Sequence, residues 1–285
     1  MHGPRLGAHM SIAGGPANAL TRGHSIGCDT IQMFTRNANQ WRAKPLEEAD
    51  IAAFVSARAS TGIEPVVAHS SYLINLGTAD DDLWARSQAA LLDELERCAA
   101  LGIDRYVLHP GAYTDSDEAS GLMRVAEALT VAFDAPASGT VRVLLETTAG
   151  QGTSLGASFE QLAWLLDHLA APERTGICFD TAHAFAAGYD LRTPEAYAST
   201  WRHFSAVIGL QHLGCIHLND SKRPLGSRVD RHEQLGQGSI GVDAFRQLMN
   251  DSALRHVPMI LETPKGEEML EDVQNLALLR SLLTG

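Results

Sequence analysis

The chain has 285 residues, of which 45% are hydrophobic, and a net charge of −12 from 34 acidic and 22 basic side chains. The hydrophobic share suffices for a sizeable core, and the acidic balance excludes broad electrostatic attraction to nucleic acid or anionic lipid. No apolar run approaches the roughly 18 residues of a membrane span, and the N-terminal stretch lacks the apolar centre of a signal peptide. Four scattered cysteines without a C-x-x-C pair are typical of buried thiols in a reducing compartment, so we expect a cytoplasmic protein.

Short apolar or β-branched runs alternate with longer segments of helical period along the whole chain. The predicted strands cover residues 5–9, 30–34, 65–69, 105–109, 141–146, 176–180, 215–218 and 257–262. The segment 81–102 has apolar residues three and four positions apart, and helix start signals stand at Ser158 ("SFEQ") and Thr193 ("TPE"). Strands alternating with helices over residues 1–285, without a linker, favour an α/β fold of the single-domain (β/α)₈ TIM-barrel type. A doubly wound sheet is the alternative.

Imidazole or carboxylate side chains stand at or near the ends of most predicted strands, namely His9, His69, His109, Glu146, Asp180, His217 and Glu262. In a TIM barrel the C-terminal strand ends converge on the active site, so these side chains would meet there. Each alone would be an ordinary structural residue, but several carboxylates in one crowded site require cations. Imidazole mixed with carboxylate, without thiolate, favours Zn²⁺, Mn²⁺ or Fe²⁺ over Ca²⁺ or Mg²⁺, and the set is too large for one zinc ion.

Two further pairs enlarge this set. Asp180 and His183 lie together in "FDTAH", and Asp230 and His232 are one residue apart in "VDRHE". The second pair would project to one side if the loop is locally extended, because alternate residues of an extended chain share a face. The glycines of the following "LGQGSIG" allow a tight turn or a close approach of the backbone to a ligand. A solvated loop with incidental charges is the alternative.

Five stretches resemble the endonuclease IV family of apurinic/apyrimidinic (AP) endonucleases: "GAHMSIAGG", "HSSYLINLG", "ETTAGQGTSLG", "DTAHAFAAGYDLRTP" and "HLNDSKRPLGSRVDRHEQLGQGSIG". The similarity covers essentially the whole chain in order. It implies a TIM barrel with three zinc ions, one of which could be replaced by Mn²⁺ or Fe²⁺. By this resemblance the first ion has the ligands His69, His109 and Glu146. The second has Glu146, Asp180, His217 and Glu262, and the third has His183, Asp230 and His232.

The resemblance also implies a reaction. Such enzymes hydrolyse the phosphodiester 5′ to an abasic site in duplex DNA with a hydroxide activated by the metal ions. They leave a 3′-hydroxyl and a 5′-deoxyribose phosphate, and related proteins trim blocked 3′ ends. We expect Glu146, Glu262 and His109 to be central to catalysis, and the protein to be a monomer. A metal-dependent sugar isomerase or epimerase could share this barrel, but it would have little use for the third ligand group. A non-catalytic, zinc-dependent DNA-binding module is a further alternative.

An acidic protein needs local contacts to bind DNA, because three zinc ions would still leave a net charge of −6 (−12 + 6). The candidate DNA contacts are Arg36, Asn39, Gln40, Tyr72, Leu73, Lys222, Arg228 and Arg231, with Arg42, Lys44 and Arg223 as further loop charges. Tyr72 and Leu73 match family positions that insert at the damaged step. The chain departs from the family at Asn39, where an inserted arginine is common, and at Thr147, where an asparagine is common.

Overall fold

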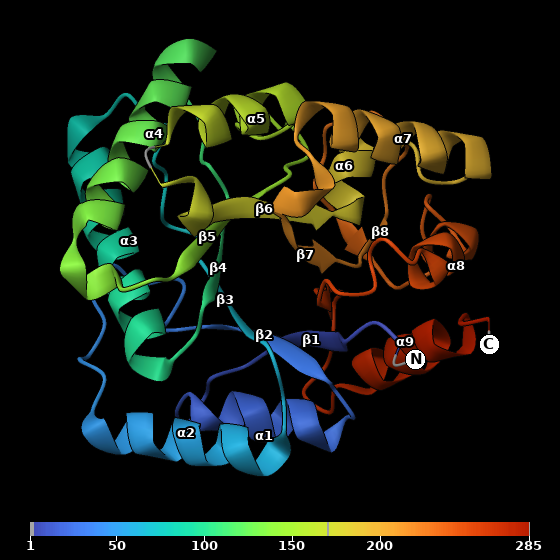
Figure 1. The fold of residues 1–285 in the computed structure, drawn as a ribbon, viewed down its shortest axis with the longest axis horizontal. Coiled ribbons are helices and arrows are strands. Elements are labelled where there is room, and N and C mark those ends of the chain that lie inside the picture. The colour runs from blue at the N-terminus through green and yellow to red at the C-terminus, as the bar shows by residue number, and fades with distance from the viewer. Residues whose placement is uncertain (1–2, 170, 285) are drawn as a thin grey trace.

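The computed structural model describes residues 3–169 and 171–284 and contains a closed barrel of parallel strands (Figure 1). The barrel strands are β1 (Leu6–Met10), β2 (Thr30–Phe34), β3 (Val66–His69), β4 (Arg105–Leu108), β5 (Arg142–Glu146), β6 (Thr175–Asp180), β7 (Leu213–His217) and β10 (Met259–Leu261). Their order around the ring is β1-β10-β7-β6-β5-β4-β3-β2, which is chain order closed by the β1-to-β10 pairing. The predicted TIM barrel is confirmed, and closure of the ring excludes the doubly wound alternative.

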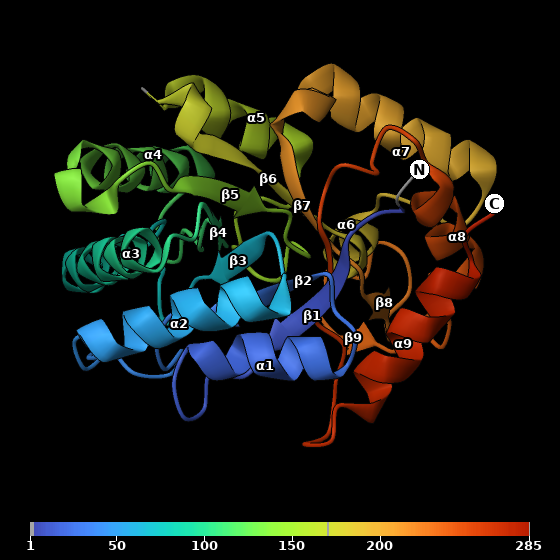
Figure 2. The ribbon, with the colours of Figure 1, turned by 60° about the horizontal axis from the view of Figure 1, so that its bottom comes forward.

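Helices cover the outside of the barrel, except for the short α6 (Thr181–Ala187), which directly follows β6 at the C-terminal ends of the strands (Figure 2). They are α1 (Ala17–Ser25), α2 (Glu48–Thr61), α3 (Asp81–Leu101), α4 (Glu118–Asp134), α5 (Phe159–His168), α6 (Thr181–Ala187), α7 (Pro194–Val207), α8 (Val242–Asn250) and α9 (Leu270–Ser281). Short 3₁₀ turns lie at Pro136–Ser138, Pro172–Arg174 and Leu210–His212. Within the described residues, none of the helices combines the length and the apolarity needed to cross a bilayer.

The bounds of the strands differ from the predicted ones by at most two residues, so the sequence patterns locate these elements closely. The predicted start signals are confirmed. The Ser158 hydroxyl accepts a hydrogen bond from the Gln161 backbone, and the Thr193 hydroxyl accepts one from Ala196. Helix α3 ends at Gly102, whose φ of 67° is a left-handed conformation that glycine adopts without strain. One element was not predicted: an antiparallel ladder between β8 (Asp220–Ser221) and β9 (His232–Glu233).

Side chains along each strand point alternately into the barrel and towards the helices, which divides the core into two parts. One large cluster fills the space between the barrel and its helices. A smaller one fills the barrel interior and consists of Val67, Val107, Leu144, Cys178, Cys215 and Ile260. These six side chains are fully buried. Because every second residue faces inward, the residues two positions further along β3, β5, β6 and β7 also face the axis, where the strands end. Those residues are His69, Glu146, Asp180 and His217.

A register shift between β6 and β7 brings two of these inward residues together. Ile177 pairs with Leu213, but Cys178 pairs with Cys215, so β7 has one extra residue, Gly214. The shift places Asp180 opposite His217. Without it, Asp180 would lie beside Ile216, which packs in the outer cluster. Bulges that redirect side chains are common beside active sites.

Gly214 has no room for a side chain, which gives a stability prediction. A Cβ at this position would lie 2.5 Å from Cδ2 of the buried Leu144. Gly214→Ala should therefore lower the free energy of unfolding by about 1–3 kcal/mol, because the barrel interior cannot expand freely. Urea denaturation measures the change. Gly266→Ala is the matched control, since a Cβ there would meet only ordinary contacts at 3.8–3.9 Å. Equal stability of the two variants would contradict the close packing of Gly214 against Leu144.

Candidate metal centre

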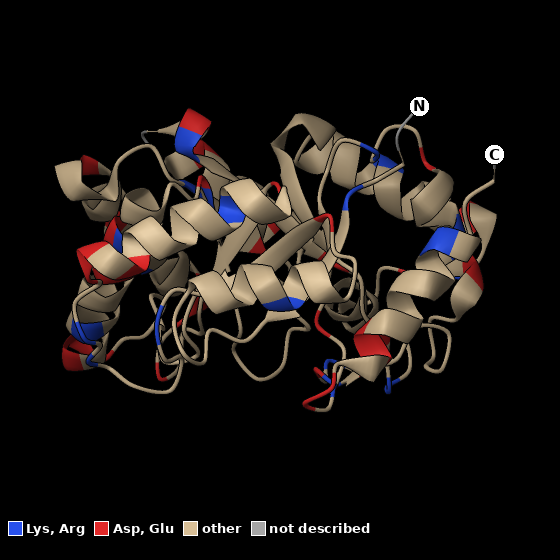
Figure 3. Ribbon diagram, turned by 90° about the horizontal axis from the view of Figure 1, so that it is seen from below, with Lys and Arg blue, Asp and Glu red and all other residues tan. Residues whose placement is uncertain are grey.

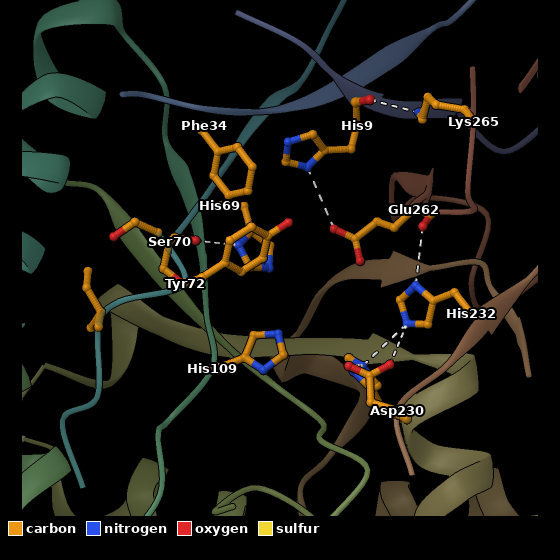
Figure 4. Close-up of a pocket in the computed structure, with 13 residues that line it drawn as sticks. His9, Phe34, His69, Ser70, Tyr72, His109, Asp230, His232, Glu262 and Lys265 are labelled. Carbon is orange, nitrogen blue, oxygen red and sulfur yellow. Dashed lines mark hydrogen bonds and ion pairs between the residues drawn. The ribbon is translucent and has the colours of Figure 1, made fainter. Parts of the chain in front are cut away.

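A cavity of about 490 Å³ opens at the C-terminal ends of the strands (Figure 4). Its walls carry His9, Phe34, His69, Ser70, Ser71, Tyr72, Ile74, His109, His183, Asp230, His232, Glu262 and Lys265. Three of the strand-end residues, Glu146, Asp180 and His217, are fully buried and contact side chains of these walls. The structure therefore brings the predicted ligand residues to one mouth of the barrel, although they are spread along the chain from position 69 to position 262.

The first predicted ligand group comes from three consecutive strands. His69 ends β3, His109 follows β4 directly, and Glu146 ends β5. Both imidazoles face the same carboxylate oxygen: His69 Nε2 lies 3.2 Å and His109 Nε2 lies 3.0 Å from Glu146 Oε2. One ligand atom from each residue falls within 4.8 Å of the others, which is a spacing that a single ion can bridge. The structure thus brings these three predicted residues together.

The second predicted group faces the other oxygen of Glu146. His217 Nδ1 lies 3.1 Å from Glu146 Oε1 and 3.1 Å from Glu262 Oε2. Asp180 Oδ2 lies 3.7 Å from the same nitrogen. Potential ligand atoms of all four residues lie within 4.8 Å of one another. Glu146 thus points one oxygen at each of two groups, which is the arrangement of a bridging carboxylate.

The third group lies between α6 and the β8–β9 ladder. His183 Nε2 and His232 Nε2 are 3.4 Å apart, and Asp230 is 3.3 Å and 3.4 Å from these two nitrogens. Asp180 Oδ2 is 3.7 Å from His232 Nε2 and forms a compact trio with the two histidines. The sequence predicted Asp230 as the carboxylate of this group. The structure adds Asp180, which therefore links the second group to the third.

The charges of these residues are strongly coupled. Burial alone would raise the pKa of Glu146, but the facing His109 and His217 hold it well below its usual value. Burial likewise opposes protonation of His183, yet the Asp180 and Asp230 carboxylates raise the pKa of its imidazole well above the ordinary value. The pKa of Asp230 falls to about 2, against the effect of burial, because His183 donates to it. In the metal-free chain, protons on imidazoles supply the positive charge that these carboxylates need.

Residues beside the groups fix their orientation, and two of them were not singled out from the sequence. Gln32 on β2 accepts from His217 Nε2 at 2.7 Å and donates to Glu262 Oε1 at 2.5 Å. Asn219 donates to Asp180 Oδ2 at 2.7 Å and accepts from the Glu262 backbone at 2.9 Å. Such hydrogen bonds hold metal-binding side chains in place. Gln32 ends no predicted strand, and only its inward position, one strand away from His9, could have indicated this role.

Thr147 also contributes to this support, at the position where the family commonly has asparagine. Its hydroxyl accepts from the Asp180 backbone at 2.8 Å, and its carbonyl accepts from His183 Nδ1 at 2.9 Å. The second of these bonds leaves Nε2 of His183 facing the third group. Threonine therefore orients both residues through one side-chain bond and one backbone bond.

Asp220 explains the glycine-rich loop after His232. Its buried carboxylate accepts hydrogen bonds from the backbone N–H groups of Ser221, Gly236, Gly238, Ile240 and Gly241. A Cβ at Gly238 would overlap this carboxylate. The sequence predicted a tight turn or a close approach to a ligand. The close approach occurs, but to Asp220 of the same chain, and it anchors the ladder that carries His232.

The candidate DNA contacts lie on loops at this mouth of the barrel, and all but one of them are at least partly exposed. Tyr72 is 71% exposed and packs edge-on against Phe34, whereas Leu73 is half-buried. The other candidates that reach the surface are Asn39, Gln40, Lys222, Arg228 and Arg231, with Arg42, Lys44 and Arg223 nearby on the same loops. In the view of Figure 3, acidic and basic residues are interspersed along the helices and loops.

Arg36 is the exception. Its side chain is only 3% exposed, and its Nε donates to the buried Glu94 at 2.8 Å. Nη1 donates to the carbonyl of Trp41 at 3.0 Å, and Glu94 also accepts from Tyr106. The guanidinium therefore holds the loop after β2 against α3. The predicted contact of Arg36 with phosphate is wrong, because a buried and paired guanidinium is not available to DNA.

The donor chemistry of the centre fits divalent transition metals. Its carboxylates pair with imidazoles, and among the described residues none of them has a lysine or arginine partner within 4.0 Å. Burying several carboxylates is costly unless cations compensate them. Mixed nitrogen and oxygen donors at these spacings suit Zn²⁺, Mn²⁺ or Fe²⁺.

Comparison with known proteins places this chain in a family. A model described as the xylose isomerase-like TIM barrel matches residues 20–282. A probable endonuclease 4 from Chloroflexus aggregans is 53% identical over 280 residues, covering 98% of each chain. The crystal structure of endonuclease IV from Thermus thermophilus superimposes with a TM-score of 0.87, with 38% identity and 98% of each chain covered. The chain belongs to the endonuclease IV family of AP endonucleases, within the xylose isomerase-like barrels.

A D-tagatose 3-epimerase-like protein superimposes with a TM-score of 0.74 but is only 16% identical, over 98% of this chain and 96% of that one. At that identity the likeness extends to the barrel alone. A shared barrel does not imply a shared reaction, because function depends on the site.

Metal binding should release protons. Burial lowers the pKa values of His69 and His183, but the carboxylates that face these imidazoles outweigh it, so both pKa values are raised in the metal-free fold. The pKa of His217 is also raised against the effect of burial, by Cys178 and then by Glu262 and Glu146. A histidine with a raised pKa stabilises the metal-free fold at low pH, and this stabilisation is lost as the pH rises through that pKa. Because zinc must displace these protons, its affinity should increase with pH. Titration calorimetry of chelated protein in two buffers of different ionisation enthalpy measures the release. A zinc-binding heat that is independent of the buffer would contradict the assignment.

Proposed function

We propose that this protein is a DNA-repair endonuclease that hydrolyses the phosphodiester 5′ to an abasic site in duplex DNA. The products would be a 3′-hydroxyl and a 5′-deoxyribose phosphate, and blocked 3′ ends would be further substrates. The cofactor would be three zinc ions, with Mn²⁺ or Fe²⁺ possible at one position. Membership of the endonuclease IV family supports this proposal. The observation that carries it is the pair of shared carboxylates: Glu146 faces two ligand groups, and Asp180 links the second group to the third.

Charge favours a phosphodiester over a neutral sugar. The centre contains four carboxylates, from Glu146, Asp180, Asp230 and Glu262. Three divalent ions would leave a local charge of +2 (+6 − 4), whereas two would leave the site neutral (+4 − 4). A net positive site attracts an anion, and neutral imidazoles add no charge to it. The third group thus supports nuclease chemistry over an isomerase reaction.

Divalent ions in such a centre lower the pKa of water and neutralise charge on a phosphodiester. The chain's own residues orient these parts. His69 Nδ1 donates to the carbonyl of Ser70 at 2.8 Å, which directs Nε2 towards Glu146. Gln32 performs the same role for His217. These fixed donors hold the metal-binding atoms in position before the substrate arrives, so little reorganisation is needed during the reaction.

Substrate binding would depend on the rim of the cavity. Tyr72 projects from the loop after β3 and presents an exposed ring beside the cavity, where it can support an unstacked nucleotide. Lys222, Arg228 and Arg231 lie on the loop that also carries Asp230, so phosphate contacts there would be made next to the third group. Asn39 and Gln40 are exposed on the loop after β2, in the region where Arg36 is buried.

The decisive assay is nicking of a duplex that contains one synthetic abasic site. Purified zinc-loaded protein should cut it on the 5′ side without added Mg²⁺, because the ions belong to the protein. Gel electrophoresis of an end-labelled strand locates the cut, and an undamaged duplex is the control. An uncut abasic duplex, together with turnover of a ketose by the same preparation, would favour the sugar isomerase instead.

Glu262→Gln should reduce turnover by on the order of 100-fold or more, because it removes charge from the second group while keeping the size of the side chain. The amide introduced by this substitution can still contact Gln32, so the fold should be preserved, as circular dichroism would verify. Glu267→Gln, on the exposed loop that follows, is the matched control and should cleave normally. Near-normal cleavage by Glu262→Gln would remove this residue from the mechanism.

A further inference from the structure

Two thiols lie directly beneath the candidate centre and are not used by the proposed reaction. Cys178 on β6 and Cys215 on β7 are paired across the sheet and are fully buried. Each lies two residues before a predicted metal ligand, Asp180 and His217 respectively, and faces the barrel axis with it. The register shift at Gly214 creates this pairing, since an unshifted β7 would place Gly214 opposite Cys178.

The spacing of these thiols fits a metal ion. One ligand atom from each of Cys178, Cys215 and His217 lies within 4.8 Å of the other two. An ion bound at about 2.0–2.3 Å in trigonal or tetrahedral geometry separates its ligand atoms by roughly 3.3–4.0 Å. The strands already hold the three residues side by side, so rotation of the side chains can bring the ligand atoms from their present separation to the one that an ion requires.

The surroundings select the kind of ion. Val67, Val107, Leu144 and Ile260 complete the ring around the two cysteines and exclude water from it. A divalent cation bound to two thiolates is neutral, and a neutral complex is the form that such a dry, apolar layer accommodates at least cost. Thiolates prefer soft cations over the hard cations that carboxylates bind.

We propose that Cys178, Cys215 and His217 form a separate site for a thiophilic divalent cation, with Cd²⁺ as the probe. Binding forms two sulfur–metal bonds and one nitrogen–metal bond, and the two thiol protons pass to the solvent. His217 also belongs to the second ligand group, so an ion in the sulfur site withdraws this imidazole from the catalytic centre. The protein is therefore inhibited by thiophilic metals through a route distinct from simple replacement of zinc. This inhibition rests on the proposed nuclease function, whereas the binding does not.

Ultraviolet spectroscopy tests the binding. Zinc-loaded protein, kept reduced with a phosphine and incubated to equilibrium with Cd²⁺, should develop the sulfur-to-cadmium charge-transfer absorption of one ion per chain. Cys178→Ala and Cys215→Ala should each lose most of this absorption. Cys28→Ala and Cys98→Ala are matched controls, because these cysteines are also buried but lie outside the barrel interior, and they should keep it. Absence of the band in the unmutated protein, or its full retention in Cys215→Ala, would overturn the proposal.

Nicking of the abasic duplex tests the inhibition. Cys215→Ala should need at least tenfold more Cd²⁺ for half-inhibition than the unmutated protein, and its nicking without Cd²⁺ shows that it is folded. If that variant does not fold, the same comparison is made with Cys178→Ala. Equal inhibition of variant and unmutated protein would overturn the withdrawal of His217. An unmutated protein that shows the band but never nicks the duplex would contradict the proposed function and leave the sulfur site supported.

Discussion

The arrangement of this barrel depends on the cost of removing carboxylates from water. Glu146 and Asp180 are fully buried at the ends of neighbouring strands, and positive charge is needed beside them for the chain to fold around them. Imidazoles supply that charge as protons in the metal-free fold, and divalent ions bound there would displace those protons into the solvent. In the proposed mechanism the same side chains would serve both folding and catalysis, and each of these two carboxylates is shared between candidate ligand groups.

Strand geometry converts this requirement into a site. Inward-facing residues below the mouth are apolar or thiol-bearing, and the candidate metal ligands lie one layer higher. A single extra residue, Gly214, keeps this layering aligned between β6 and β7. The outer helices contribute indirectly, as when Arg36 fastens the loop after β2 to Glu94 of α3. The rim of the cavity is therefore fixed by contacts that never reach the metal-binding residues.

Much of this could be predicted from the sequence, for definable reasons. An apolar run that ends in an imidazole or carboxylate locates both a strand and its functional end, which is why His69, Glu146 and Asp180 were identified. Local patterns do not reveal which side chains partner one another across the fold. Arg36 was predicted to contact phosphate because its partner, Glu94, lies 58 positions away in the sequence. Asp220 likewise gave no signal, because four of its five partners are backbone groups of a loop that lies 16 to 21 residues later.

The anchoring of the glycine-rich loop by Asp220 has a consequence for how such barrels diversify. Asp230 and His232 both belong to one connection, between β7 and α8, and this connection folds largely upon itself through five backbone hydrogen bonds to a single carboxylate. A segment that carries its own anchor can be gained or lost as a unit while the strands stay unchanged. The third ligand group then needs this segment together with His183 on α6, and the barrel strands can stay as they are.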